Sequence, residues 1–349
     1  MGIQAMGGPI RGISQYFDLQ CGRGYKIPSM GFGTYRMDAD AARQAVTYAI
    51  QCGFRHVDCA KIYGNEAAVG EALKHVAATN IAKREQLFVT SKLWPTDQHP
   101  DHVEKACRAT LRDLQLEYLD LYLIHWPVAW KHTGKFDTDE DRMPRGANGL
   151  ALVDHTVTLQ DTWRAMCRLV DLGLVRSIGL SNCNVAHVEE IMQIVEHQRH
   201  APVVNQIEFH PGCFQSDLWS SNGEHGLHTA AYCPLGMPTR FTPAGFTGIV
   251  NDDMMKPLSQ NSGFSPARVL LNWNLDNGNI VIVKSTKKEH IEDNAKACRY
   301  ALSDSVRWVL NHFEDQLEKS MRVIDPVDFT DKEGPFFPPR GIRRRVHRP

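Results

Sequence analysis

The sequence has no long hydrophobic run and almost no net charge. No stretch approaches the roughly 18 consecutive apolar residues of a membrane-spanning helix, and the first 20 residues lack the apolar core of a secretion signal. The 349 residues carry a formal net charge of −1 with a pI near 7.0, so no global field favours nucleic acid or a membrane surface. These absences predict a cytoplasmic protein, expected to be a monomer, whose partner is a small molecule, with no nucleic acid and no membrane.

Sequence patterns for disulfides, metals and a Rossmann-type nucleotide site are also missing. The nine cysteines are an odd number without a Cys-x-x-Cys pair, which predicts reduced thiols. Gly31-Phe32-Gly33 is followed by Arg36, so no Gly-x-Gly-x-x-Gly turn is formed. Histidine pairs occur at metal-ligating spacing without carboxylates at neighbouring strand ends, and we expect solvated histidines and no bound metal. These pairs are His99/His102, His197/His200 and His225/His228.

Short β-rich runs alternate with amphipathic segments along most of the chain. The eight expected strands lie near residues 29–35, 56–60, 87–93, 119–126, 176–182, 203–209, 228–235 and 280–285. The expected helices lie near residues 39–52, 66–77, 100–114, 156–171, 185–198, 264–276 and 288–299, with a weaker one near 216–225 that is rich in Ser, Asn and Gly. Strand–helix alternation predicts a parallel sheet, and eight units predict an α/β fold closed into a (β/α)8 TIM barrel.

Local signals and loop lengths suggest how the chain is divided. Asp38 and Ser265, the latter followed by proline, are expected N-caps of the helices that they precede. We expect an N-terminal arm (1–23), a single barrel domain (24–312) and a C-terminal extension (313–349). Residues 127–155 and 236–262 form long connections after the fourth and seventh strands, on the face where such barrels place their active sites.

Three of the predicted strands end in ionisable residues. Asp58, Lys92 and His125 end the second, third and fourth strands, and Tyr63 follows Asp58 in a Gly/Asn turn. Singly, each has a simpler interpretation, such as a cap, a solvated strand end or a core histidine. Together they would meet at one mouth of the barrel, where burial without mutual pairing is costly. We therefore interpret the four residues as one catalytic set.

Residues 53–70, GFRHVDCAKIYGNEAAVG, resemble the first signature of the aldo-keto reductase family at every restricted position. The runs VRSIGLSN (175–182), VVNQIEFHP (203–211), AYCPLG (231–236) and IVIVKST (280–286) resemble its later landmarks in the same order. The resemblance extends from about residue 24 to residue 294. It implies an NADPH-dependent reductase of aldehydes or ketones.

The catalytic roles follow from the chemistry of the four side chains and agree with what the resemblance implies. Tyr63 would donate a proton to the carbonyl oxygen, and a nearby Lys92 ammonium would stabilise the phenolate. Asp58 would pair with Lys92 and keep it charged inside the barrel. His125 would donate a hydrogen bond that orients the substrate.

The remaining landmarks suggest a site for NADPH. Ser181, Asn182 and Gln206 offer hydrogen bonds for a carboxamide, and Tyr232 offers a ring face for stacking. Lys284, Ser285 and His290, with Lys287 and Lys288 nearby, suggest a phosphate pocket at the end of the eighth strand. By resemblance, Leu235 and Asn294 complete the cofactor set. Tyr35, Trp94 and Trp126 would form an aromatic substrate wall.

Some positions depart from the family pattern, and other functions stay open. Cys59 and Cys233 replace small hydroxyl residues, Tyr35 replaces a frequent Trp, and His290 replaces a frequent arginine near the adenosine. The alternatives are a nucleotide-binding regulatory subunit and a structural protein on the same fold. Turnover of an aldehyde would separate a reductase from both.

Overall fold

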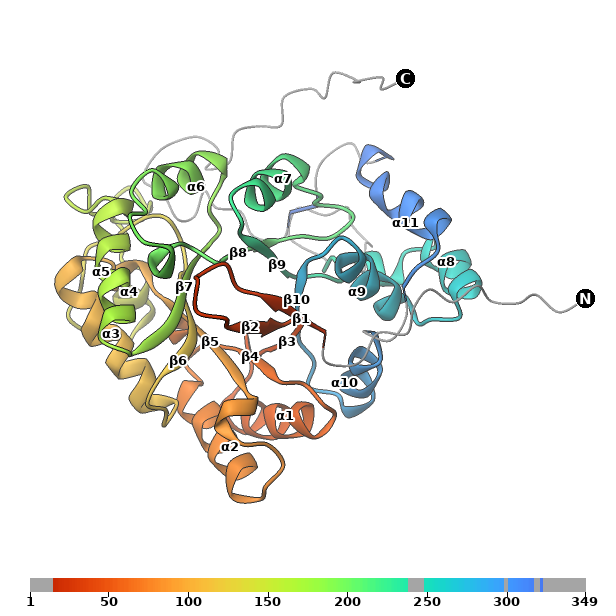
Figure 1. The fold of residues 1–349 in the computed structure, drawn as a ribbon, viewed down its shortest axis with the longest axis horizontal. Coiled ribbons are helices and arrows are strands. Elements are labelled where there is room, and N and C mark those ends of the chain that lie inside the picture. The colour runs from red at the N-terminus through yellow and green to blue at the C-terminus, as the bar shows by residue number, and fades with distance from the viewer. Residues whose placement is uncertain (1–14, 238–247, 298–300, 317–320, 323–349) are drawn as a thin grey trace, which may run out of the picture.

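The computed structural model describes residues 15–237, 248–297, 301–316 and 321–322, and it has the predicted (β/α)8 barrel (Figure 1). Eight parallel strands close it in the order β10-β3-β4-β5-β6-β7-β8-β9. The strands are β3 (Met30–Gly33), β4 (His56–Asp58), β5 (Phe88–Leu93), β6 (Leu119–Ile124), β7 (Val175–Ser181), β8 (Val204–Glu208), β9 (His228–Tyr232) and β10 (Ile280–Val283).

One helix after each barrel strand forms the outer ring. These helices are α1 (Ala39–Gln51), α2 (Glu66–Ala78), α3 (Pro100–Asp113), α5 (Leu159–Asp171), α6 (Val185–Met192), α7 (Ser216–Glu224), α9 (Pro266–Asp276) and α10 (Lys288–Ala295). Three further helices are α4 (Asp139–Arg142), α8 (Met255–Ser262) and α11 (Asp304–Asn311). The sequence did not predict these three, and α6 ends before the expected 198.

The predicted helix starts are confirmed. The Asp38 side chain accepts a hydrogen bond from the backbone N–H of Ala41 at 2.8 Å, and Ser265 caps α9 in the same way. The weakly expected α7 also forms, although its composition opposes a helix. Its buried Asn222 donates to Thr229 Oγ1 at 3.0 Å and accepts from Asn205 at 3.2 Å, so tertiary hydrogen bonds hold the segment to β8 and β9.

A short hairpin covers the amino end of the barrel. Strands β1 (Tyr16–Asp18) and β2 (Lys26–Pro28) pair antiparallel and cross this end, as the dark red segment of Figure 1 shows. Ile27 packs in one buried cluster with Phe88 and Ile280, the first residues of β5 and β10. Strands of three residues are too short to show an alternating pattern, so the sequence did not predict the hairpin.

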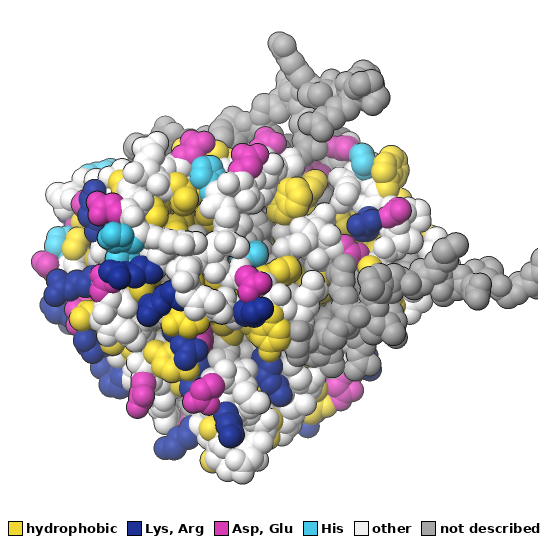
Figure 2. Space-filling view, in the orientation of Figure 1, with side chains coloured by type: hydrophobic (Ala, Val, Ile, Leu, Met, Phe, Trp, Pro, Cys, Tyr) yellow, Lys and Arg dark blue, Asp and Glu magenta, His cyan; other side chains and the backbone are white. Residues whose placement is uncertain are grey.

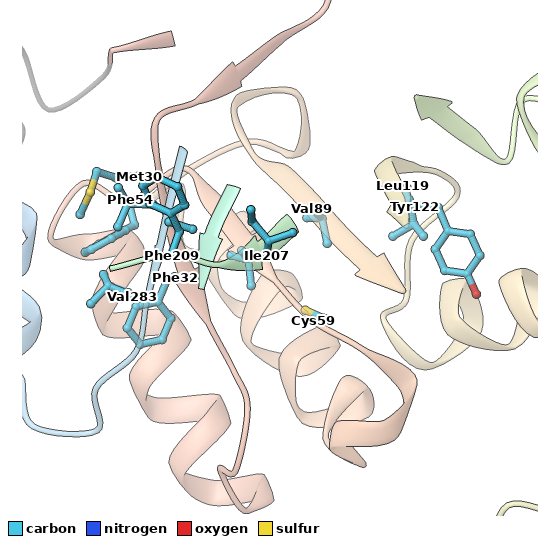
Figure 3. Packing of buried hydrophobic residues seen from close by; sticks show 14 of the residues in the cluster. Met30, Phe32, Phe54, Cys59, Val89, Leu119, Tyr122, Ile207, Phe209 and Val283 are labelled. Atoms are coloured by element: carbon cyan, nitrogen blue, oxygen red, sulfur yellow. The ribbon is translucent and has the colours of Figure 1, made fainter. Parts of the chain in front are cut away.

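Strand alternation separates two cores. Outward-facing residues such as Phe32 and Val283 pack against the helices, and Phe32 meets Phe54 edge-on at 5.6 Å between ring centroids (Figure 3). Inward-facing positions are apolar at the amino end. Gly31 is required on the inner face because a Cβ there would lie 2.6 Å from Ile282 Cδ1 and 2.7 Å from His56 Nδ1.

Because of this alternation, every second residue of a strand faces the barrel interior, from the amino end to the carboxyl end. Going along β5, the inner positions run from Phe88 through Thr90 to Lys92. On β4, His56 precedes Asp58 in the same phase, and the His56 imidazole bonds Thr90 Oγ1 at 2.9 Å. The barrel interior therefore changes from an apolar plug at the amino end to a polar layer at the carboxyl end.

The surface at the amino end carries charges of both signs. Figure 2 shows Lys and Arg side chains interspersed with Asp and Glu, with the positive groups most frequent over α3 and its neighbours. Within the described ranges, no helix is long and apolar enough to cross a membrane.

Candidate active site

An ion pair at the carboxyl ends of β4 and β5 forms the centre of the site. Lys92 Nζ donates to both carboxylate oxygens of Asp58, at 2.6 and 2.8 Å, and to the Cys59 carbonyl oxygen at 2.8 Å. Both side chains are almost fully buried, at 0% and 3% exposure. Gln206 Nε2, from β8 across the barrel, donates to Asp58 Oδ2 at 2.9 Å. The predicted pairing of Asp58 with Lys92 is present.

Tyr63 lies within reach of this pair. It ends the 3-10 turn η1 (Lys61–Tyr63) directly after β4, and its hydroxyl oxygen accepts a hydrogen bond from Lys92 Nζ at 3.3 Å. Burial, followed by the Asp58 carboxylate, raises the pKa of the Tyr63 phenol well above its usual range. The sequence-based expectation was a phenolate favoured by Lys92. The direction is opposite here because burial disfavours the charged phenolate and the nearby Asp58 carboxylate adds to this effect, so the phenol stays protonated.

His125 completes the group from the end of β6. Its imidazole packs edge-on against Trp94 at 5.1 Å and against Tyr63 at 6.0 Å between ring centroids. Burial, and then the nearby Lys92, lower the pKa of His125 well below its usual value, so the ring is neutral. The buried Nδ1 has no hydrogen-bond partner among the described residues. All four predicted residues meet at one place.

The residues predicted to hold a carboxamide form a connected row beside the ion pair. Ser181 Oγ donates to the Gln206 carbonyl oxygen at 2.9 Å, and Asn182 Nδ2 donates to the His125 carbonyl oxygen at 2.9 Å. The Tyr232 hydroxyl donates to Asn182 Oδ1 at 2.8 Å. The donor set of one hydroxyl and two amides beside a half-buried phenol ring fits a nicotinamide with its carboxamide.

The residues predicted for the phosphate end lie at and beyond the end of β10. Lys284 and His290 are exposed, and neither has an ion-pair partner within the described parts of the chain. Ser285 Oγ accepts from the Lys287 backbone N–H at 3.1 Å, and Lys288 lies over the Tyr48 ring at 5.0 Å. These exposed cations fit a phosphate group. The two predictions made by resemblance alone lie in packed positions, with Asn294 buried and Leu235 half-buried against the core.

Aromatic residues line one side of the site, and the 127–155 connection holds them. Trp94 and Trp126 are buried in a cluster with Trp130 and residues of that connection. Trp94 Nε1 donates to the Arg142 carbonyl oxygen at 2.6 Å. Tyr35 is 48% exposed and lies 5.1 Å from the Tyr63 ring, so it is the most open of the predicted substrate residues.

The sequence analysis did not predict several contacts of this site. The Gln206–Asp58 and Asn182–His125 bonds join the proposed cofactor row to the catalytic group. The inward phase of β8 was the available signal for Gln206, since Val204 and Gln206 share one face. Parts of other predictions lie outside the described residues, namely residues 1–14 of the N-terminal arm, 238–247 of the second loop, and 317–320 and 323–349 of the C-terminal extension.

No group of three or more His, Cys, Asp or Glu is arranged to hold a metal ion in the parts of the chain that the structure describes. Two of the histidine pairs named above, His99/His102 and His197/His200, have ring centroids 5.5 and 5.9 Å apart.

A barrel of this topology with a buried Asp–Lys–Tyr–His group defines an enzyme of the carbonyl-reducing class. The Aldo/keto reductase family matches residues 29–308, and the chain belongs to it. It is 40% identical over 310 residues to aldo-keto reductase family 1 member A1-A of Danio rerio, covering 88% of this chain and 91% of that protein. The human family 1 member A1 is 39% identical over 306 residues, covering 87% and 90% of the two chains.

Solved structures give the same result for the fold. The Bombyx mori aldo-keto reductase, determined in complex with NADP, superposes with a TM-score of 0.78 at 31% identity, covering 91% of this chain and 97% of that one. The aldose reductase of Schistosoma japonicum superposes with a TM-score of 0.75 at 36% identity, covering 86% and 92%.

Proposed function

We propose that this chain reduces aldehydes or ketones with hydride from NADPH and that Tyr63 is the general acid. One observation carries the assignment of roles: Lys92 Nζ contacts both the Asp58 carboxylate and the Tyr63 hydroxyl inside a buried mouth. The chain is an oxidoreductase by its family, and the Bombyx mori relative solved with NADP supports the choice of cofactor.

The described side chains divide the work in the following way. Bound NADPH supplies the hydride. The raised pKa of Tyr63 keeps its proton available until the carbonyl oxygen gains negative charge, and Lys92 compensates the phenolate as that proton leaves. Neutral His125 donates an N–H hydrogen bond to the same oxygen and orients it.

The cofactor would be held from both sides of the mouth. Ser181, Asn182 and Gln206 would bind the carboxamide, and the Tyr232 ring would stack on the nicotinamide. Lys284, Ser285 and His290 would bind the phosphate that distinguishes NADPH from NADH, and Leu235 and Asn294 would border the same groove.

The substrate would be an apolar, aromatic carbonyl compound. Trp94 and Trp126 lie in one apolar cluster, and Tyr35 presents an exposed ring beside Tyr63. A cytoplasmic monomer, expected from the composition, completes the proposal. Light scattering on the purified protein would test the monomeric state.

Turnover of 4-nitrobenzaldehyde, followed by the loss of NADPH absorbance, tests this function. Tyr63→Phe keeps the ring and removes the proton, so kcat should fall by about 10² to 10⁴ while NADPH still binds. Tyr118→Phe is the matched control, because the Tyr118 hydroxyl, at the opposite end of the barrel, is buried and has no hydrogen-bond partner among the described residues. NADPH binding by the wild type without turnover would instead indicate a regulatory nucleotide-binding protein. Near-normal turnover by Tyr63→Phe would remove the acid assignment.

A further inference from the structure

The last two described residues of the chain, Met321 and Arg322, contact the loop that follows β8. The Met321 backbone N–H donates to the Gly212 carbonyl oxygen at 2.8 Å, and the Met321 side chain is buried. A Cβ at Gly212 would lie 2.8 Å from Met321 Sδ, so the two residues are closely packed. Met321 is therefore packed against the loop that follows β8.

Arg322 lies next to this contact and reaches the end of β8 through one glutamine. Arg322 Nη2 donates to Gln215 Oε1 at 2.9 Å, and Gln215 Nε2 donates to the Glu208 carbonyl oxygen at 2.7 Å. Burial opposes the Arg322 charge, but nearby groups, among them Glu208, outweigh it and raise the pKa of the guanidinium. Arg322 is thus a partly buried cation held beside an acidic strand end.

Glu208 is the residue through which Arg322 reaches the site. It is fully buried, its carboxylate bonds the His210 imidazole at 2.9 Å, and it is the register partner of Tyr232 on β9. Burial and then Glu208 raise the pKa of the Tyr232 phenol, while Arg322 acts on it in the opposite direction. The three groups therefore lie within electrostatic reach of one another.

Tyr232 in turn hydrogen-bonds Asn182, which holds the His125 carbonyl. We propose that Arg322 is a positioning residue that fixes the Glu208 end of β8 and, through it, the Tyr232 ring, so that docking of Met321 and Arg322 strengthens cofactor binding. This inference rests on the proposed function, because it takes Tyr232 and Asn182 as the nicotinamide site. It adds a coupling between a residue remote from the reacting atoms and the affinity for NADPH.

Binding of NADPH to the full-length protein, measured by quenching of intrinsic fluorescence, tests the coupling. Arg322→Met should raise the NADPH Kd by about tenfold or more, since a hydrogen-bonded charge inside the protein is lost. Arg322→Lys should restore most of that affinity by returning the charge. Arg307→Met is the control, because Arg307 forms an exposed ion pair with Asp304 in the same part of the chain. The KM for the aldehyde should change less than the Kd for NADPH.

A second variant tests the same coupling should Arg322→Met fail to fold. Gln215→Leu severs the relay without removing a charge, and it should weaken NADPH binding in the same direction by a smaller factor. An unchanged NADPH Kd in folded Arg322→Met, or in Gln215→Leu should Arg322→Met not fold, would overturn the inference even if the melting temperature fell. Absence of NADPH binding and turnover in the wild type would instead overturn the proposed function.

Discussion

The two ends of the barrel each bury a carboxylate against positive charge, and they use it differently. At the amino end, Asp120 binds Arg84 at 2.8 Å and Arg176 at 3.0 Å, and its side chain is 5% exposed. At the carboxyl end, Asp58 binds Lys92 at 2.6 Å and is 3% exposed. The two carboxylates are therefore buried to nearly the same extent, and the two ends differ in what else their cation partners contact.

The amino-end pair is closed. Asp120 also accepts from the Val89 backbone N–H at 2.9 Å, and the two guanidinium groups lie over the Tyr118 ring at 4.0 and 3.9 Å. Planar arginines that both stack and bind one carboxylate hold two strand starts and the loop before β5 together. This arrangement is suited to stability, which is the usual role of that face in a TIM barrel.

The carboxyl-end pair also contacts the proposed proton donor, Tyr63. The Lys92 ammonium has a third contact, to the Tyr63 hydroxyl at 3.3 Å, in addition to its contacts with Asp58 and the Cys59 carbonyl. The Lys92 ammonium therefore lies where it can stabilise the phenolate formed when Tyr63 loses its proton, whereas the two guanidinium groups face Asp120 and the Tyr118 ring. Nearly equal burial of the two carboxylates thus says little about the role of each pair.

Removing the lysine should give the largest effect. In Lys92→Met the phenolate formed during proton transfer loses its neighbouring cation, and we expect kcat/KM to fall by at least about 10²-fold. In this variant the buried Asp58 carboxylate keeps its hydrogen bond from Gln206 but loses its cation. The double variant Asp58→Asn with Lys92→Met removes that unpaired charge. Steady-state kinetics on both variants, with circular dichroism to confirm the fold, measure the effect. Activity within tenfold of the wild type in the double variant would remove Lys92 from the chemistry.

His56, which lies between the two ends of the barrel, should make the free energy of unfolding depend on pH. Burial lowers the pKa of His56 to about 4, below the value of about 6.5 in an unfolded chain. The unfolded state then binds the extra proton between these values, so the free energy of unfolding should fall as the pH drops from about 6.5 to 4, by about 3 kcal/mol at most. Urea unfolding at several pH values should show a weaker dependence in His56→Gln. Parallel pH curves for the two proteins would contradict this assignment.

Breaking the amino-end pair should change stability and leave chemistry intact. Asp120→Asn removes the charge that holds Arg84 and Arg176, whose side chains are partly exposed and can be hydrated. We expect a loss of about 2 kcal/mol in the free energy of unfolding with kcat unchanged. Chemical denaturation and turnover measured on the same preparation separate the two. A loss of kcat comparable with that of Lys92→Met would end the contrast between the two ends.

The sequence could predict one end better than the other. Asp58, Lys92 and His125 follow apolar strands in a fixed inward phase, so their convergence follows from the barrel alone. The hairpin was not predictable, because its strands have three residues each and gain their stability from contacts with strands distant in the sequence.

No pattern in the sequence indicated the contacts of Arg322 either. Its role depends on how the chain returns after α11, and such tertiary contacts leave no periodic pattern in the sequence. The direction of the Tyr63 pKa was not predictable for a related reason, since it depends on how deeply the phenol is buried and then on the nearby Asp58 carboxylate.

The positive charges at the two rims differ in whether they have an ion-pair partner, and this difference leads to the smallest of the expected effects. Arg84 and Arg176 at the amino end are paired, whereas Lys284 at the carboxyl end is exposed and has no ion-pair partner among the described residues. A cation without a partner is available to the 2′-phosphate of NADPH, and an exposed charged hydrogen bond supports a preference over NADH of about tenfold.

Lys284→Met should remove most of that preference, and Lys287→Met should not, because Lys287 lies farther from the end of β10. Since the interaction is ionic and exposed, the preference of the wild type should also shrink as salt rises toward molar concentration. Comparing kcat/KM for the two cofactors at low and high salt measures both effects. Equal use of NADH and NADPH by the wild type at low salt would show that Lys284 does not bind the 2′-phosphate. The two rims would then differ only in how far their cations are exposed to solvent.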